Sequence, residues 1–251
     1  MLTLEEAFED DYVSRRRHIR ALAALVAVVC VAPVSAQSDD SGDDWSYELI
    51  PYLWASALDG RIGAGSSSAD VSASFKDLAE FRNVGFSMRM TATREPIQWY
   101  GEASYVQLEN DTIAPAGPTR VKTTQTLAEV GLTYDFDEEL AAYAGVRYQD
   151  VIGVLQGPSY RTDQEREWLD GYVGARWNAI KSERWSAWLR GDVGAGGSKF
   201  TWLAEAGGGY HWGSRWAAYL AYRVLDTDYE HGGLLYDVKL SGLLFGFGIR
   251  L

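Results

Sequence analysis

The chain has 251 residues, of which 23 are Lys or Arg and 35 are Asp or Glu, giving a formal net charge of −12. So acidic a protein offers little basic surface for phosphate contacts, and we expect no nucleic-acid partner. The length suits a single domain, and because the chain has no run of about 20 apolar residues, a transmembrane helix is excluded.

A secretory signal peptide is predicted over residues 1–36. A basic run at residues 15–20 precedes an apolar stretch at residues 21–34, and the small Ala36 suits cleavage before Gln37. Cys30 lies within this leader, and Val29 before it is larger than a lipid-attachment motif requires. We therefore expect an exported chain with no cysteine, and hence neither a disulfide nor a thiol nucleophile. Residues 37–44, acidic and rich in Ser and Gly, are expected to form a disordered linker.

Residues 45–251 alternate with a period of two. Over residues 84–93, for example, Val, Phe, Met, Met and Ala alternate with Gly, Ser, Arg, Thr and Thr. Charges and glycines spaced in this way would make a poor soluble core. In a transmembrane β-barrel the apolar side chains face lipid while charges and glycines face the lumen, and tryptophans gather at the two interfaces. The pattern favours an all-β, antiparallel, up-and-down transmembrane β-barrel in the bacterial outer membrane.

Ten segments are long enough to cross a membrane as tilted strands. They are residues 46–55, 83–94, 98–109, 122–136, 140–152, 167–180, 185–196, 200–212, 216–229 and 236–251. An eight-stranded barrel is the alternative. Short connections at 95–96, 137–139, 181–183 and 213–214 alternate with longer ones at 58–82, 110–121, 153–166 and 226–235, as expected for periplasmic turns and extracellular loops.

A short helix is predicted in the first long loop. Ser74 and Asp77 have the spacing of a helix cap, and Phe75, Leu78 and Phe81 recur at helical intervals. We expect this helix to pack on the barrel mouth.

Charged residues of both signs fall on the face predicted to line the lumen. Arginine can bond two carboxylates at once, so this set predicts a paired interior network that plugs the barrel. The alternative is a narrow polar channel for ions or small solutes. The predicted lumen network consists of Glu48, Arg89, Glu102, Glu129, Arg147, Asp170, Arg176, Arg190, Asp192, Glu205 and Arg223.

The alternation conflicts within the last strand. Asp237 and Lys239 have odd numbers, as do four apolar residues at the end of the strand, yet charged and apolar side chains are expected on opposite faces. A β-bulge near Gly242 would resolve it by resetting the alternation. The terminal residues Phe245, Phe247, Ile249 and Leu251 then resemble the C-terminal signal of outer-membrane proteins, which implies recognition by the barrel-assembly machinery.

Three further motifs resemble a family of uncharacterised proteobacterial outer-membrane barrels, more broadly the small OmpA- and OmpX-type barrels. These motifs are Trp45 with Pro51-Tyr52-Leu53-Trp54, Ser74-Phe75-x-Asp77-Leu78, and residues 221–229 with the sequence AYRVLDTDY. The resemblance implies an integral outer-membrane barrel and says little about a reaction. We expect a structural or surface-interaction role for it. We expect its partners to be outer-membrane lipid and lipopolysaccharide, and we expect it to be a monomer.

No enzyme activity, cofactor or metal site is predicted, because the sequence has no HExxH, GxSxG, P-loop or CxxC motif. His231 lies near Asp226, Asp228 and Glu230, which keeps an outer-membrane protease as a minor alternative. A lipid-modifying hydrolase with a Ser–His pair facing lipid is another minor alternative, although the alternation of side chains along the strand places His211 on the lumen face.

Overall fold

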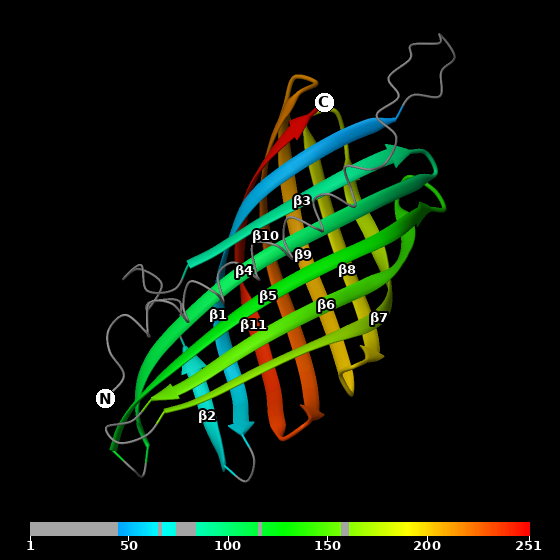
Figure 1. Ribbon diagram of the computed structural model, residues 1–251. Coiled ribbons are helices and arrows are strands. Elements are labelled where there is room, and N and C mark those ends of the chain that lie inside the picture. The colour runs from blue at the N-terminus through cyan, green and yellow to red at the C-terminus, as the bar shows by residue number, and fades with distance from the viewer. Residues whose placement is uncertain (1–44, 65–66, 74–83, 115–116, 157–160) are drawn as a thin grey trace. The chain divides into compact units, whose positions relative to one another are not determined.

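The computed structural model describes residues 45–64, 67–73, 84–114, 117–156 and 161–251, and every regular element within them is a β-strand (Figure 1). No helix in these ranges is long and apolar enough to cross a membrane. The predicted signal peptide, the acidic linker and the helix at 74–81 lie outside the described residues. The strands are β1 (Ser46–Ala64), β2 (Ser67–Ala73), β3 (Val84–Arg94), β4 (Ile97–Ala114), β5 (Gly117–Asp135), β6 (Leu140–Gln156), β7 (Arg161–Lys181), β8 (Trp185–Gly196), β9 (Phe200–Trp212), β10 (Trp216–His231) and β11 (Leu234–Arg250).

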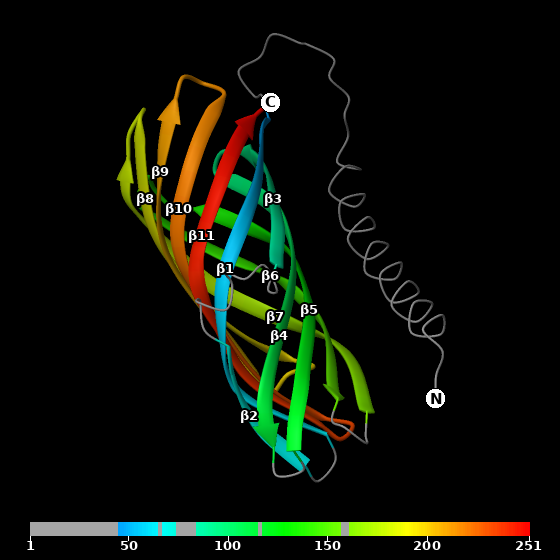
Figure 2. The same cartoon turned by 90° about the vertical axis from the view of Figure 1, so that its left-hand side faces the viewer.

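Ten of these strands close into an antiparallel barrel. Each pairs with its neighbour in the chain, and β11 returns to pair with β1 from Glu48↔Arg250 to Ala64↔Leu234, so the two lie side by side in Figure 2. The extra strand β2 pairs with β1 over residues 58–64, beyond the stretch of β1 that pairs with β3. The prediction of ten strands is therefore confirmed, and the eight-strand alternative is wrong.

Most of the segments predicted as long loops are continuations of strands. Strands β4 and β5 stay paired as far as Ala114↔Gly117, and β10 and β11 as far as His231↔Leu234. In β11 the prediction failed because the outward side chains of Asp237 and Lys239 are polar, which interrupts the apolar outer face although the backbone pairing continues. A strand whose outer face meets water needs only one apolar face.

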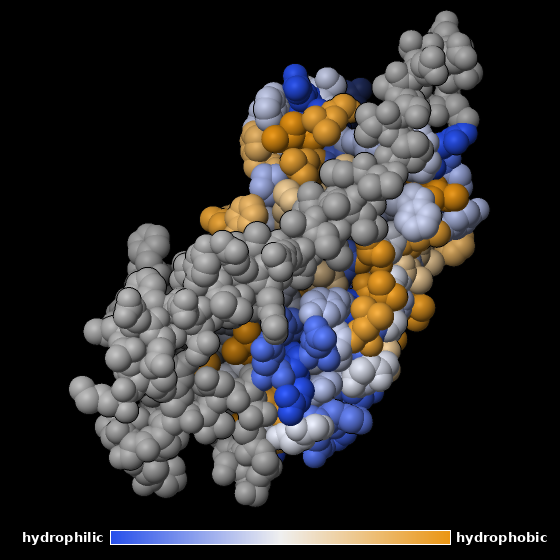
Figure 3. Space-filling view, in the orientation of Figure 1, coloured by the Kyte–Doolittle hydropathy of each residue, from blue (hydrophilic) through white to orange (hydrophobic). Residues whose placement is uncertain are grey.

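We call the end that carries Trp45, Leu251 and the turns at 95–96, 136–139, 182–184 and 213–215 the turn end, and the opposite end the loop end. The turn half comprises residues 46–57, 216–224 and 241–250 and the strand segments beside them. Its outer face is apolar, with Leu53, Leu220 and Phe245 each at least half exposed. In Figure 3, hydrophobic surface gathers toward the turn end at the top, and a hydrophilic area lies below it.

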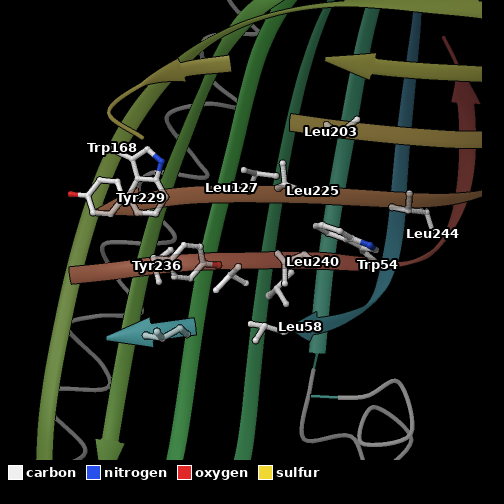
Figure 4. Packing of buried hydrophobic residues seen from close by; sticks show 14 of the residues in the cluster. Trp54, Leu58, Leu127, Trp168, Leu203, Leu225, Tyr229, Tyr236, Leu240 and Leu244 are labelled. Atoms are coloured by element: carbon white, nitrogen blue, oxygen red, sulfur yellow. The ribbon is translucent and has the colours of Figure 1, made fainter. Parts of the chain in front are cut away.

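The loop half comprises residues 58–64, 225–231 and 234–240 and the segments beside them. Its outer face carries exposed charges that include Asp59, Arg61, Asp237 and Lys239. Its inner face holds an apolar core that the sequence pattern did not predict. In Figure 4, Trp168 stacks on Tyr229, with ring centroids 4.2 Å apart, and Tyr236 lies on the neighbouring strand. The inner core, which Trp54 and Leu244 extend into the turn half, consists of Trp54, Leu58, Ile62, Val106, Leu127, Val151, Trp168, Leu203, Leu225, Tyr229, Leu234, Tyr236, Val238, Leu240 and Leu244.

The expected bulge near Gly242 is wrong, since the register of β11 is unbroken against both β1 and β10. Asp237 and Lys239 do share the outer face with Phe245, but they lie in the loop half and Phe245 lies in the turn half. Gly242 is needed for a close approach of strands instead, because a Cβ there would lie 1.9 Å from the carbonyl oxygen of Ala55. A register shift does occur in β7, between Asn178 and Ile180.

Candidate functional site in the barrel interior

The strand register brings several predicted lumen residues into neighbouring inward positions. Arg89 lies opposite Glu102 across β3 and β4, and Arg147 lies opposite Glu129 across β5 and β6. Glu205 lies between Arg190 on β8 and Arg223 on β10. Carboxylates and guanidinium groups therefore meet inside the barrel, where they form two clusters.

The three-arginine cluster consists of Arg89, Arg190 and Arg223 with Glu102 and Glu205. Arg223 reaches across the barrel to Glu102 at 2.5 Å and also bonds Glu205 at 2.6 Å. Arg190 donates two hydrogen bonds of 3.1 Å to Glu205. Arg89 bonds Glu102 at 3.2 Å, so this single carboxylate serves several guanidinium groups.

The Arg147 cluster consists of Arg147, Glu129 and Asp192. The guanidinium of Arg147 donates to Glu129 at 2.6 Å and to Asp192 at 3.0 Å, and none of its surface is exposed. A third hydrogen bond, of 3.3 Å, goes to the hydroxyl of Thr201, and the guanidinium also lies over the ring of Tyr172.

The charges of the two clusters balance. Three arginines and two glutamates give the first cluster a formal charge of +1, while one arginine and two carboxylates give the second −1. Charges buried at this depth are costly unless they are paired, and arginine supplies enough donors to pair with several acceptors. The clusters thus form a network inside the barrel in which the loss of one partner leaves a buried charge unpaired.

Tyrosines complete this network, although they were not among the predicted residues. Tyr52 donates to Glu102 at 2.5 Å, and Tyr143 donates to Asp192 at 3.1 Å. The hydroxyls of Tyr100 and Tyr172 lie 2.6 Å apart. The same two-residue parity that selected the charged residues would also have selected these tyrosines.

Three of the predicted residues lie outside the two clusters. Asp170 accepts from the indole of Trp168 at 3.1 Å and from the backbone N–H of Ser198 at 2.8 Å. Glu48, near the turn end, accepts from Tyr219 at 2.7 Å and lies 3.6 Å from Arg250. Arg176 pairs with Asp135 at 3.1 Å, and both side chains are about one-fifth exposed.

A cavity of about 540 Å³ occupies the turn half of the barrel. Its outer rim includes Lys181, Ser182 and Glu183 of the β7–β8 turn, and its inner wall includes the three-arginine cluster. Ile50, Ala221 and Leu244 line an apolar part of the wall. The cavity is thus a pocket that runs from the turn end to the charged interior.

The pocket also contains a Ser–His pair. Ser186 Oγ lies 3.1 Å from His211 Nε2, and Arg250 lies 3.1 Å from His211 Nδ1. Because an arginine can only donate, Nδ1 accepts and the neutral ring carries its proton on Nε2. Nε2 then donates to Ser186 and cannot remove its proton, which a nucleophilic serine would require. The pair is suited to fixing the ends of β8, β9 and β11.

Within the described ranges, no group of three or more His, Cys, Asp or Glu side chains is placed to hold a metal ion. His231 is exposed at the loop end, where its ring lies 6.2 Å from that of Tyr229.

No protein-family model matches the sequence, and no curated protein does. Among solved structures, the chain is similar to Ail, the attachment invasion locus protein of Yersinia pestis, with 10% identity over 83% of this chain and 99% of that one and a TM-score of 0.43. It is also similar to the outer membrane protease OmpT of Escherichia coli, with 8% identity, 86% and 99% coverage and a TM-score of 0.46. Neisserial surface protein A gives 12% identity, 82% and 97% coverage and a TM-score of 0.35. None of these similarities assigns a role to a residue of this chain.

Proposed function

We propose that this protein is an integral barrel of the bacterial outer membrane, with a structural or surface-interaction role and an interior closed to solutes. The apolar outer face of the turn half fits the hydrocarbon of a bilayer, and the closed pairing of β11 with β1 leaves no strand edge there. Short turns and both barrel termini at one end fit a periplasmic turn end.

The buried Arg–carboxylate network is the observation that carries this proposal. Arg147 is fully buried between its two carboxylates, and the inner core fills the loop half beyond it. Small barrels of this strand number are normally filled by their own side chains. A solute entering from the turn end would therefore stop at the three-arginine cluster.

The loop half provides the surface for interaction. Its outer face exposes Asp59, Arg61, Asp237 and Lys239, and in the proposed orientation it projects from the outer leaflet. Mixed charges at this height are suited to contacts with lipopolysaccharide head groups or with surface partners. The barrel needs neither a cofactor nor a second subunit for this role, and we propose a monomer without enzyme activity.

A narrow channel is the second candidate, and the turn-half cavity favours it. The cavity already crosses part of the barrel and reaches charged side chains. Rearrangement of the two clusters would be needed to continue it to the loop end.

Conductance in planar bilayers separates the two candidates. The refolded wild-type barrel should give no discrete current steps, and neither should Arg215→Ala, which alters an exposed arginine in the β9–β10 turn. The channel would be favoured over the closed barrel if the wild type gave ion-selective current steps that change in Arg147→Ala and persist in Arg215→Ala.

A further inference from the structure

The cavity of the turn half is more basic than the rest of this acidic protein. Six basic and four acidic side chains line it, whereas the whole chain has a formal net charge of −12. The basic residues are Arg89, Arg176, Lys181, Arg190, Arg223 and Arg250, and the acidic residues are Glu48, Glu102, Glu183 and Glu205.

Arg176 is incompletely compensated in this wall. It lies directly opposite Arg190 in the β7–β8 register, and like charges in that position repel. Arg190 is already held by two hydrogen bonds to Glu205. Within the described residues, Nε of Arg176 is buried and has no hydrogen-bond partner, while its other nitrogens reach Gln98 and Asp135.

Arg89 adds a second incompletely paired guanidinium. Its ion pair is with Glu102, which also serves Arg223 at 2.5 Å, and its guanidinium lies 4.9 Å from the centre of the Tyr100 ring. The charges of Arg89 and Arg176 are close enough to act on each other. A bound oxyanion would relieve this repulsion between the two guanidinium groups.

Another part of the wall, next to these arginines, is apolar and aromatic, and Ile50 lies directly opposite Arg89 in the β1–β3 register. Ile50 and Leu244 line it, and Trp188 and Tyr219 meet edge to face with ring centroids 6.0 Å apart. The volume of about 540 Å³ lies in the range typical of small-molecule pockets, which combine apolar walls with a few converging polar groups. The pocket therefore offers cationic groups beside an apolar surface.

We propose that this cavity binds a small organic anion that enters from the turn end. Its carboxylate or phosphate group contacts Arg89 and Arg176, and its apolar part lies against Ile50, Tyr219 and Leu244. The site is separate from the surface-interaction role, because it opens at the opposite end of the barrel from the exposed charges of the loop half.

The test is a titration of the ¹⁵N-labelled, refolded barrel in an uncharged detergent, followed at the indole N–H resonance of Trp188. This resonance is assigned by its loss in Trp188→Phe. Phenyl phosphate and benzoate serve as the anionic probes, benzylamine as the cationic probe and inorganic phosphate as the probe without an apolar part. We expect a saturable shift with one or both aromatic anions, weaker binding of inorganic phosphate and no saturable shift with benzylamine. Comparison of the two aromatic anions tells which head group the site prefers.

Two variants and one control locate the site. Arg176→Gln should weaken binding of the preferred aromatic anion by about tenfold, the effect of losing one charge-assisted hydrogen bond. Ile50→Trp should abolish binding by filling the apolar side, and Arg215→Gln, at an exposed turn, should bind like the wild type. If Arg176→Gln fails to fold, as judged by heat-dependent gel mobility, Ile50→Trp and the probe series decide. Equal shifts with benzylamine and the anions, or wild-type affinity in the folded variants, would overturn the proposal.

Discussion

The two halves of this barrel have opposite polarity on the same strands. In the turn half of β11, Phe245 faces outward and Gly246 inward, whereas in the loop half Lys239 faces outward and Leu240 is buried inside. The inward and outward parity is continuous across Gly242, so the change of polarity involves no change of register. The proposed membrane position accounts for this difference, since lipid favours an apolar outer face and water favours an apolar interior.

The change of polarity between the two halves explains where the charged clusters lie. Arg147 bonds Thr201, whose hydroxyl lies 3.4 Å from that of Thr227, and Thr227 is two residues from Leu225 of the inner core. The charges of the Arg147 cluster therefore adjoin apolar side chains and are distant from bulk water. In such surroundings every charge needs a partner, and the network behaves as one unit.

The largest effect is expected where the two halves meet. Arg147→Ala leaves Glu129 and Asp192 unpaired in a buried site, and breaking a buried pair costs about 3–5 kcal/mol. The urea midpoint of the barrel refolded in phospholipid vesicles should fall accordingly, while Arg215→Ala at the exposed turn should leave it almost unchanged.

A compensated variant tests the cause of that loss. Arg147→Met combined with Glu129→Gln and Asp192→Asn removes the charges together and should recover most of the stability. If the triple variant is as unstable as Arg147→Ala, lost packing around the guanidinium accounts for the effect, and charge pairing is not its cause.

The polarity of the outer face can be tested with one substitution in each half. Leu220→Arg places a charge on the lipid-facing surface of the turn half and should cost about 2–4 kcal/mol near the midplane. Asp237→Arg places the same side chain on the outer face of the loop half, opposite Asp228, and should change the free energy of unfolding little. Similar losses in both variants would show that both halves lie in lipid.

The continuous register of β11 predicts a smaller effect at Gly242. A Cβ at this position would meet the backbone of β1, so Gly242→Ala should cost about 1–3 kcal/mol, the usual effect of overpacking. Gly171→Ala is the matched control, because nothing lies within 4 Å of its added Cβ. Urea unfolding of both variants gives the measurement, and equal stability would argue against the tight approach of β1 to β11.

The sequence was sufficient to predict the strand count because the alternation of inward and outward side chains is clear in the turn half of every barrel strand. It failed at the strand ends, where residues such as Asp237 and Lys239 resemble a loop although they pair with β1. Only knowledge of where the bilayer ends distinguishes a polar outer face from a loop, and the strand pattern carries no such information.

The sequence also placed the charged residues of the candidate site on one face without dividing them into clusters. Arg223 and Glu102 are separated by 121 positions and meet across the barrel, whereas Asp170 bonds Trp168 and Ser198. Such partnerships depend on strand tilt and on the direction of each side chain across the interior. The inner core was missed for a related reason, because an apolar inner face is expected only where the outer face meets water.

The smallest effect is expected at the turn end, outside the membrane-spanning strands. The backbone N–H groups of Leu140 and Glu139 donate to Asp137 Oδ1 at 2.7 and 2.8 Å, which lowers the pKa of this carboxyl below its ordinary value. Because the pKa is lower in the folded state, the carboxylate stabilises the turn at pH values above the unfolded pKa of about 4. That stabilisation is lost as the pH falls through the lower folded pKa. Asp137→Asn should therefore be slightly less stable than the wild type at neutral pH, and the difference in urea midpoint should vanish in strong acid. The neighbouring exposed variant Glu138→Gln serves as the control, and a difference for Asp137→Asn that persists in acid would assign the effect to geometry instead of charge.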